Sequence, residues 1–163
     1  MIVVDVTIDK NKLRKVGNRR DAIRKAQQAA FEAMGREWHA KFLMLHFQET
    51  AYDRYDIKRV GRRAGRDSKT FRYSHTGRKL RRMGHTRPLV WTGRAMMESQ
   101  LLRLTANSRW AKVRLSNRFN LRPRYSAISM RSEVTRVIPS ESAYLRRVAA
   151  AAMKAKLKEL QQS

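Results

Sequence analysis

The stretch RRDAIRKAQQAAFEAMGREWHAKFLMLHFQET, residues 19–50, decides the fold more than any other part of the chain. Its apolar residues recur every three or four positions, the spacing that places side chains on one face of an α-helix. Asn18 can cap the start of this helix, and Gly35 is a weak helix former within it. We therefore expect one long helix from about Arg19 to Thr50, whose apolar face consists of Ile23, Ala26, Ala30, Met34, Trp38, Phe42 and Leu45.

Other regular patterns lie on both sides of this helix. The β-branched stretch 2–8 and the alternating stretches 110–115 and 133–138 predict strands, the last two joined by a connection that contains Pro123. A C-terminal helix is expected from about Ser140, with Lys154 and Lys158 away from the core. Its predicted apolar side is Leu145, Val148, Ala152, Met153, Leu157 and Leu160.

Together these elements predict an α+β fold. A small, mostly antiparallel sheet would be flanked by the long N-terminal helix and the C-terminal helix. The length of 163 residues suits a single domain, since domains commonly have about 100 to 200 residues. No apolar run approaches the ~20 residues that span a bilayer, so no membrane insertion is expected. The N-terminal stretch contains Asp5 and Asp9 and does not resemble a secretory signal.

Charge is the dominant feature of the composition. Lys and Arg total 38 against 13 Asp and Glu, which leaves a net charge of +25. Residues 58–87 hold twelve of these cations and the single acid Asp67. We expect this segment to be a basic arm or long hairpin that becomes ordered on a partner, with a solvated loop as the alternative. Its candidate contacts to a partner or to DNA are Arg62, Arg63, Arg66, Lys69, Arg72, Arg78, Lys79, Arg81 and Arg82.

Catalytic and metal chemistry find little support in the sequence. The chain has no cysteine, which excludes disulfides, thiol nucleophiles and thiolate metal sites. His39 and His46 share a helix face, but no third ligand lies at a useful spacing. No nucleophile elbow, phosphate-binding loop or dinucleotide fingerprint is present. We expect no enzyme activity, catalytic residue, cofactor or metal.

Residues 87–99, RPLVWTGRAMMES, form the most distinctive motif. We expect Leu89 and Trp91 to anchor an apolar plug and Thr92 to cap a short helix that extends through Leu102. Gly93 would allow a close approach of the backbone.

The motif resembles a signature of the tail-completion and virion-morphogenesis proteins of tailed bacteriophages: an apolar pair, then Thr-Gly, then an apolar residue and Ser. In that family a long early helix with a Gly near a Trp, here Gly35 and Trp38, precedes a basic insertion and the motif. Strands and a C-terminal helix that opens near a Pro, here Pro139, follow. The resemblance therefore covers the order of elements over roughly residues 19–160.

The resemblance implies a structural protein at the neck of the virion, assembled in the host cytoplasm. Copies would form a ring, with six subunits expected and twelve as an alternative. The ring would join the connector on the capsid side to the tail, contact neighbouring neck, connector or tail-tube proteins, and surround genomic DNA in its lumen. The alternative is a basic nucleic-acid-binding protein of ribosomal type, which would share the charge and the basic arm but needs no ring.

Overall fold

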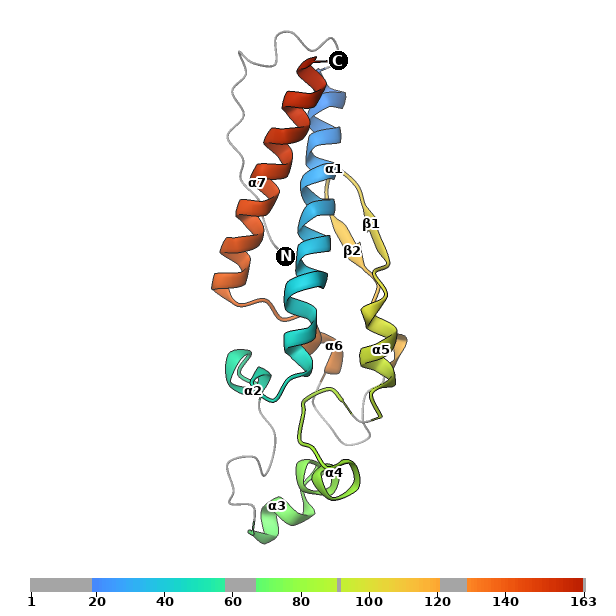
Figure 1. Ribbon diagram of the computed structural model, residues 1–163, viewed down its shortest axis with the longest axis vertical. Helices are drawn as coiled ribbons and strands as arrows, with labels where there is room; N and C mark the ends of the chain where they lie inside the picture. Colours follow the sequence, from blue (N-terminus) through green and yellow to red (C-terminus); the bar gives the residue numbers. More distant parts are fainter. Residues whose placement is uncertain (1–18, 58–66, 91, 121–128, 163) are drawn as a thin grey trace. The chain divides into compact units, whose positions relative to one another are not determined.

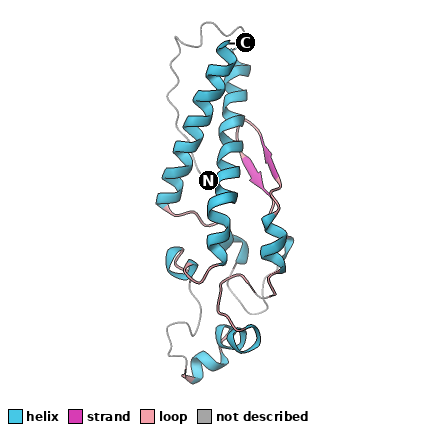
Figure 2. Ribbon diagram, in the orientation of Figure 1, coloured by secondary structure: helices cyan, strands magenta, loops and turns pink. Residues whose placement is uncertain are grey.

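The structure is a computed structural model that describes residues 19–57, 67–90, 92–120 and 129–162. Within these ranges helices predominate and a single two-stranded antiparallel sheet is present (Figures 1 and 2), so the protein has an α+β fold. The chain divides into two compact units. The first contains the long N-terminal and C-terminal helices and the sheet, and the second contains most of the short helices.

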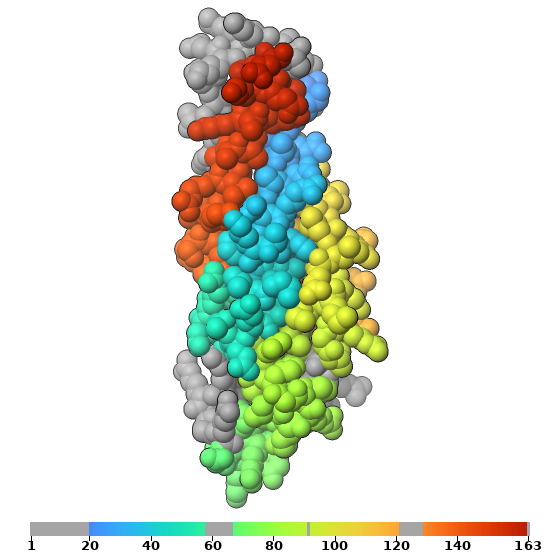
Figure 3. All heavy atoms as spheres, in the orientation of Figure 1, coloured from blue at the N-terminus to red at the C-terminus, as the bar shows by residue number. Residues whose placement is uncertain are grey.

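In the first unit, α1 (Arg19–Glu37) and α7 (Pro139–Gln162) pack side by side along their lengths (Figure 1). The two helices are antiparallel, and their atoms meet without a gap on the face shown in Figure 3. The residues buried between the two helices recur at every fourth position of each helix, so they share one face. Most of them on α1 are alanines, whose small side chains let the helices approach closely. These buried residues are Ala22, Ala26, Ala30 and Met34 on α1 and Leu145, Ala149 and Met153 on α7.

The sheet packs on α1 within the same unit. Strands β1 (Leu104–Ala106) and β2 (Ala111–Val113) pair with Thr105 opposite Lys112. Gly35 provides the space for this contact, because a Cβ at this position would lie 2.6 Å from a methyl carbon of Leu104. Gly35 thus serves packing against the sheet.

A polar cluster joins the C-terminal end of α1 to the N-terminal part of α7. The Tyr144 hydroxyl of α7 donates a hydrogen bond of 2.9 Å to Glu37 Oε2, and Lys41 Nζ lies 3.1 Å from the same carboxylate. Lys41 also donates to the Tyr144 hydroxyl. These hydrogen bonds lower the pKa of Glu37, mainly through Tyr144 and then through Lys41.

The long helix ends earlier than predicted. α1 stops at Glu37, and the chain continues as a π-helical turn, η2 (Trp38–Phe42), and a 3₁₀ segment, η3 (Leu43–Phe47). A wider π turn shifts the buried face, so burial moves to Leu43, His46 and Phe47 instead of following Trp38, Phe42 and Leu45. The predicted face is therefore buried at Ala26, Ala30 and Met34, whereas its other members are half-buried: Ile23, Trp38, Phe42 and Leu45.

The second unit has an aromatic core. His46 stacks on Tyr55 with ring centroids 3.9 Å apart, and Phe47 contacts Phe119 of η4 (Asn117–Asn120) at 5.9 Å. The short helices α2 (Ala51–Arg54) and α6 (Met130–Val134) belong to the same unit. Val134 is fully buried. The Arg136 guanidinium donates to the Tyr55 carbonyl and, at 3.2 Å, to the Asp56 carbonyl.

The predicted strands have different outcomes. The stretch 110–115 contains β2, but its partner is the nearby β1, joined to it by a turn in which Asn107 Oδ1 accepts from the backbone N–H groups of Arg109 and Trp110. The strand predicted at 133–138 is wrong, because Ser129 caps α6 there by accepting from the Ser132 N–H. The expected strand 2–8 and the connection at Pro123 lie outside the described residues.

The C-terminal helix matches its prediction closely. It begins at Pro139, one residue before the expected start, and Leu145 and Met153 are buried while Lys154 and Lys158 are exposed. Ala149 is also buried but was not part of the predicted face, whose other residues are half-buried: Val148, Ala152, Leu157 and Leu160. Among the described helices, none combines the length and the apolar character needed to cross a lipid bilayer.

Candidate functional site

Two short helices occupy the described part of the basic segment. They are α3 (Lys69–Tyr73) and α4 (His75–Met83), where an arm or hairpin was expected. The Ser68 hydroxyl accepts from the Phe71 N–H, and the Ser74 hydroxyl accepts from the Gly77 N–H at 3.0 Å, so each helix has an N-cap. Gly84, with φ 69°, ends α4 in the left-handed conformation.

The contact between α3 and α4 depends on Gly77. A Cβ at this position would lie 2.0 Å from the Phe71 carbonyl oxygen, a distance that no side chain can tolerate. The Ser74 hydroxyl also donates to this carbonyl at 2.7 Å, and Arg81 donates to the Arg72 carbonyl at 2.8 Å. The two helices therefore form one compact element, which we call the α3–α4 pair.

The segment that follows α4 fastens the α3–α4 pair to the rest of the second unit. Glu49 accepts from the Thr86 N–H at 3.2 Å and from its hydroxyl at 2.7 Å. The Tyr52 hydroxyl donates to the Thr86 carbonyl at 2.6 Å. Lys79 donates to the Arg87 carbonyl. These bonds hold the end of the basic segment at several points.

The structure separates the candidate contact residues into three groups. Arg62, Arg63 and Arg66 lie outside the described residues. Lys79 is buried, with 4% of its surface exposed, so its assignment as a contact residue is wrong. Its ammonium serves the Arg87 carbonyl instead. The remaining candidates are exposed on the α3–α4 pair, whose atoms form a continuous surface in Figure 3: Lys69, Arg72, Arg78, Arg81 and Arg82.

The electrostatics of this surface are strongly one-sided. Asp67 is the single carboxylate in residues 67–90, and within the described chain no carboxylate lies within ion-pair distance of Arg72, Arg78 or Arg82. The positive charges also affect the pKa of His85. Burial lowers the pKa of His85 below 6.5, and the charges of Lys79 and Arg87 add to this effect. The arrangement can attract an anionic partner.

The motif at residues 87–99 forms a turn followed by α5 (Arg94–Gln100). The predicted cap at Thr92 is wrong, because Gly93 is the N-cap residue and Thr92 is exposed. Gly93 has φ 80° and open space around it, so it is needed for its left-handed backbone rather than for close approach. Leu89, also at positive φ, is half-buried, and Trp91 lies outside the described residues.

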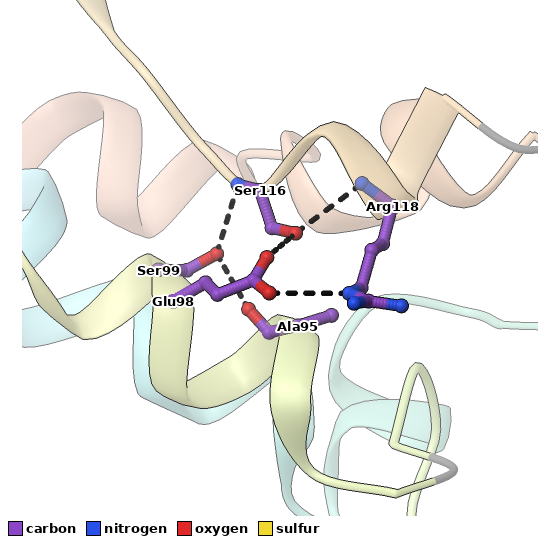
Figure 4. Close-up of polar contacts among 5 residues, drawn as sticks. All are labelled: Ala95, Glu98, Ser99, Ser116 and Arg118. Atoms are coloured by element: carbon purple, nitrogen blue, oxygen red, sulfur yellow. Dashed lines mark hydrogen bonds and ion pairs between the residues drawn. The ribbon is translucent and has the colours of Figure 1, made fainter.

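The end of the motif makes contacts that the sequence did not reveal (Figure 4). Ser99 is fully buried; its hydroxyl donates to the Ala95 carbonyl at 2.8 Å and accepts from the Ser116 N–H at 3.2 Å. Glu98 accepts from the Ser116 hydroxyl and from Arg118 Nε, the latter at 3.1 Å. These hydrogen bonds, first that of Ser116 and then that of Arg118, lower the pKa of Glu98.

Metal chemistry finds no support in the described ranges. No group of three or more His, Cys, Asp or Glu side chains in them is arranged to hold a metal ion. His46, one of the two histidines considered from the sequence, is buried in the aromatic core against Tyr55.

Comparison with known proteins gives no relative. No model of a protein family matches this chain, and no curated sequence and no solved structure is significantly similar to it.

Proposed function

We propose that the protein is a structural component of the head-tail joint of a tailed bacteriophage, where copies of the chain form a ring. The observation that carries this proposal is the structural role of Gly93 and Ser99 in the motif at residues 87–99. Two of its positions have clear structural reasons, since Gly93 adopts φ 80° at the start of α5 and Ser99 is fully buried at its end. Residues that such local geometry requires support the family resemblance better than the same residues in an irregular loop would.

The order of elements supports the same proposal. A long helix containing Gly35 comes first, followed by the basic segment, the motif helix α5, a small antiparallel sheet and the C-terminal helix α7. This is the order that the resemblance to tail-completion and virion-morphogenesis proteins implies. Gly35 also has a structural reason in its contact with Leu104.

Exposed apolar side chains on α5 and at its C-cap suit a subunit that assembles with others. Met97 of α5 and the C-cap residue Leu101 leave 64% and 61% of their surface exposed. Burial of such side chains favours association. In the proposed assembly, ring neighbours and the adjoining connector or tail proteins would cover them, while the basic side chains would face a polyanion such as genomic DNA.

The mass and shape of the purified protein test this proposal. The protein, freed of nucleic acid by nuclease and high salt, would be sized by light scattering and imaged by negative-stain electron microscopy at low and high salt. We expect closed rings of defined subunit number, six rather than twelve. A protein that stays monomeric under all conditions and binds structured RNA tightly would contradict the ring and favour the ribosomal-type alternative.

A matched pair of variants sharpens the sizing experiment. Met97→Gln and Leu101→Gln remove exposed apolar surface from α5 and its C-cap and are expected to weaken ring formation. Lys154→Gln and Lys158→Gln alter exposed positions of α7 by the same number of side chains and serve as the control. If both double variants assemble like the original protein, α5 is not part of the ring interface.

A further inference from the structure

We propose that the exposed cations of the α3–α4 pair bind the phosphate backbone of duplex DNA without reading its sequence. The inference deepens the proposed function and rests on it for its biological setting, because it assigns one partner, the DNA passing the joint, to one surface. The argument itself depends only on the side chains of the pair and their support.

The first step is the charge of the surface. Five exposed cations, two on α3 and three on α4, share a short element with no ion-paired carboxylate among the described residues. Arg78 and Arg82 are four residues apart on α4, so their side chains emerge about 5 to 6 Å from each other. Their mutual repulsion is unfavourable until an anion lies between or above them.

The second step is that the surface exists before binding. The caps at Ser68 and Ser74 and the close approach at Gly77 fix the two helices, and the Glu49–Thr86 hydrogen bonds fix the chain that leaves them. A prearranged surface loses less conformational entropy on binding than an arm that must first fold. The helices therefore present their arginines at low entropic cost.

The third step is the division of α4 into two faces. Thr76 and Gly77 are buried and Leu80 is half-buried, whereas Arg78, Arg81 and Arg82 are exposed. The helix thus uses one side to pack and the other to display charge. The burial of Lys79 fits this division, since its ammonium is engaged by the Arg87 carbonyl and not displayed.

The fourth step is the choice of phosphate over a protein surface. The buried cores of protein interfaces are depleted of charged residues, although Arg, Tyr and Met are enriched at interfaces. On the α3–α4 pair five exposed cations outnumber the two exposed large apolar side chains, Tyr73 and Met83, so the charges have too little apolar surface beside them to form the core of a protein interface. Arginine is well suited to phosphate, because its planar fork can donate two hydrogen bonds to one phosphate group.

The fifth step is the choice of duplex over single strand and of backbone over bases. Binding of single strands generally uses several aromatic side chains as stacking platforms, and this surface exposes one, Tyr73, at 77%. Residues 67–87 contain no Asn or Gln, the side chains that pair with adenine in the major groove. Arg and Lys can also pair with guanine, but contacts to phosphate are the chemistry that all five exposed cations share at any DNA sequence.

The test is a salt titration of DNA binding by the full chain. Fluorescence anisotropy would follow a labelled DNA duplex of arbitrary sequence in NaCl from about 50 to 200 mM. The variant Arg78→Gln/Arg82→Gln removes two exposed charges from α4. Each lost phosphate contact should flatten the log-log salt dependence by about 0.9, so we expect a change of about 2 and binding weaker by tenfold or more near 0.1 M salt.

The control is Arg146→Gln/Lys154→Gln, which removes two exposed charges from α7. It should leave the salt slope nearly unchanged. Circular dichroism verifies the fold of each variant, and Arg72→Gln, on α3, provides a second variant that should flatten the slope by about 0.9. Equal effects of the α4 and α7 variants would overturn the proposal, since binding would then follow total charge.

Two further probes distinguish the source of the anion. An RNA duplex and polyglutamate of matched charge would be titrated in the same way, and tighter binding of either one than of DNA would overturn the assignment. Sizing of the same preparations keeps the two proposals apart. If the protein forms rings and the α4 variant binds DNA as tightly as the original protein, this inference is contradicted and the ring is not. If the protein is a monomer and the α4 variant binds DNA more weakly, the inference is supported and the ring is contradicted.

Discussion

At the scale of single residues, replacing Gly77 by alanine changes the free energy of unfolding in two opposite ways. Helix propensity favours the alanine, and packing opposes it. Gly to Ala in an exposed helix normally stabilises by up to about 1 kcal/mol. Here the added Cβ would lie 2.0 Å from the Phe71 carbonyl oxygen. We therefore expect Gly77→Ala to destabilise the second unit by about 1 to 3 kcal/mol, measured by thermal and denaturant unfolding.

The control for Gly77 is the next residue on the same helix. Arg78→Ala also places an alanine in α4, but it replaces an exposed side chain. It should therefore change the free energy of unfolding by less than about 0.5 kcal/mol. A Gly77→Ala variant as stable as the original protein would show that α3 and α4 are not held in this contact.

Glu98 gives a prediction about pH. Its folded-state pKa is lowered from 4.5, first by Ser116 and then by Arg118, so the carboxylate is favoured in the folded protein. A lowered pKa contributes stability that is complete above the unfolded value and is lost as pH falls through the folded value. We expect the difference in melting temperature between the original protein and Glu98→Gln to shrink as pH falls below about 4.5.

The buried neighbour of Glu98 provides the comparison. Ser99→Ala removes a hydroxyl that bonds Ala95 and Ser116 and does not titrate. It should destabilise at every pH by a similar amount, about 1 kcal/mol for a typical hydrogen bond. A pH-independent effect of Glu98→Gln would mean that the carboxylate's charge is not what Ser116 and Arg118 recognise.

Several residue roles could not be obtained from the sequence. Lys79 looks like its arginine neighbours in a charge count, yet its burial is decided by the Arg87 carbonyl eight residues away. Thr92 was the predicted cap, but Gly93, with its left-handed backbone, is the N-cap of α5. Ser68 and Ser74 are residues of a type that caps helices, and each accepts from the N–H group three residues later. These caps were not predicted, because the segment was interpreted by its charge.

At the scale of elements, the packing of α1 on α7 gives a stability prediction. Leu145 is almost completely buried in this contact, so Leu145→Ala should cost about 2 to 5 kcal/mol. Lys158 lies on the exposed side of the same helix, and Lys158→Glu should change stability by less than about 0.5 kcal/mol. Unfolding curves of both variants measure the contrast. Similar losses in the two would mean that the buried face of α7 is assigned wrongly.

Elements with long periodic patterns were predictable and short ones were not. The start of α1, the start of α7 to within one residue and the location of β2 follow from side-chain spacing. The end of α1 did not, because the π turn at Trp38–Phe42 interrupts the periodicity without any Pro or cap signal. The strand expected at 133–138 rested on a short alternation, which the cap at Ser129 outweighed.

At the scale of the whole molecule, the net charge of +25 predicts the sign of the salt effect on stability. Ion pairs such as Arg36–Glu32 and Arg118–Glu98 are between exposed side chains. Exposed pairs contribute about 0 to 1 kcal/mol each, so screening them removes little. Screening the repulsion among the excess cations stabilises the folded chain, because folding concentrates that charge in a smaller volume.

We therefore expect the melting temperature, measured by calorimetry on protein freed of nucleic acid, to rise as NaCl increases from about 10 mM to 0.1 M, where the Debye length falls from about 30 to 10 Å. The Arg146→Gln/Lys154→Gln variant carries two fewer charges and should show a smaller rise, which separates repulsion from binding of chloride at a particular site. A melting temperature that falls over this range would mean that attractive pairs outweigh the repulsion. In that case the excess charge would not oppose folding, and relief of repulsion by a polyanion would no longer be a reason for its presence on the α3–α4 pair.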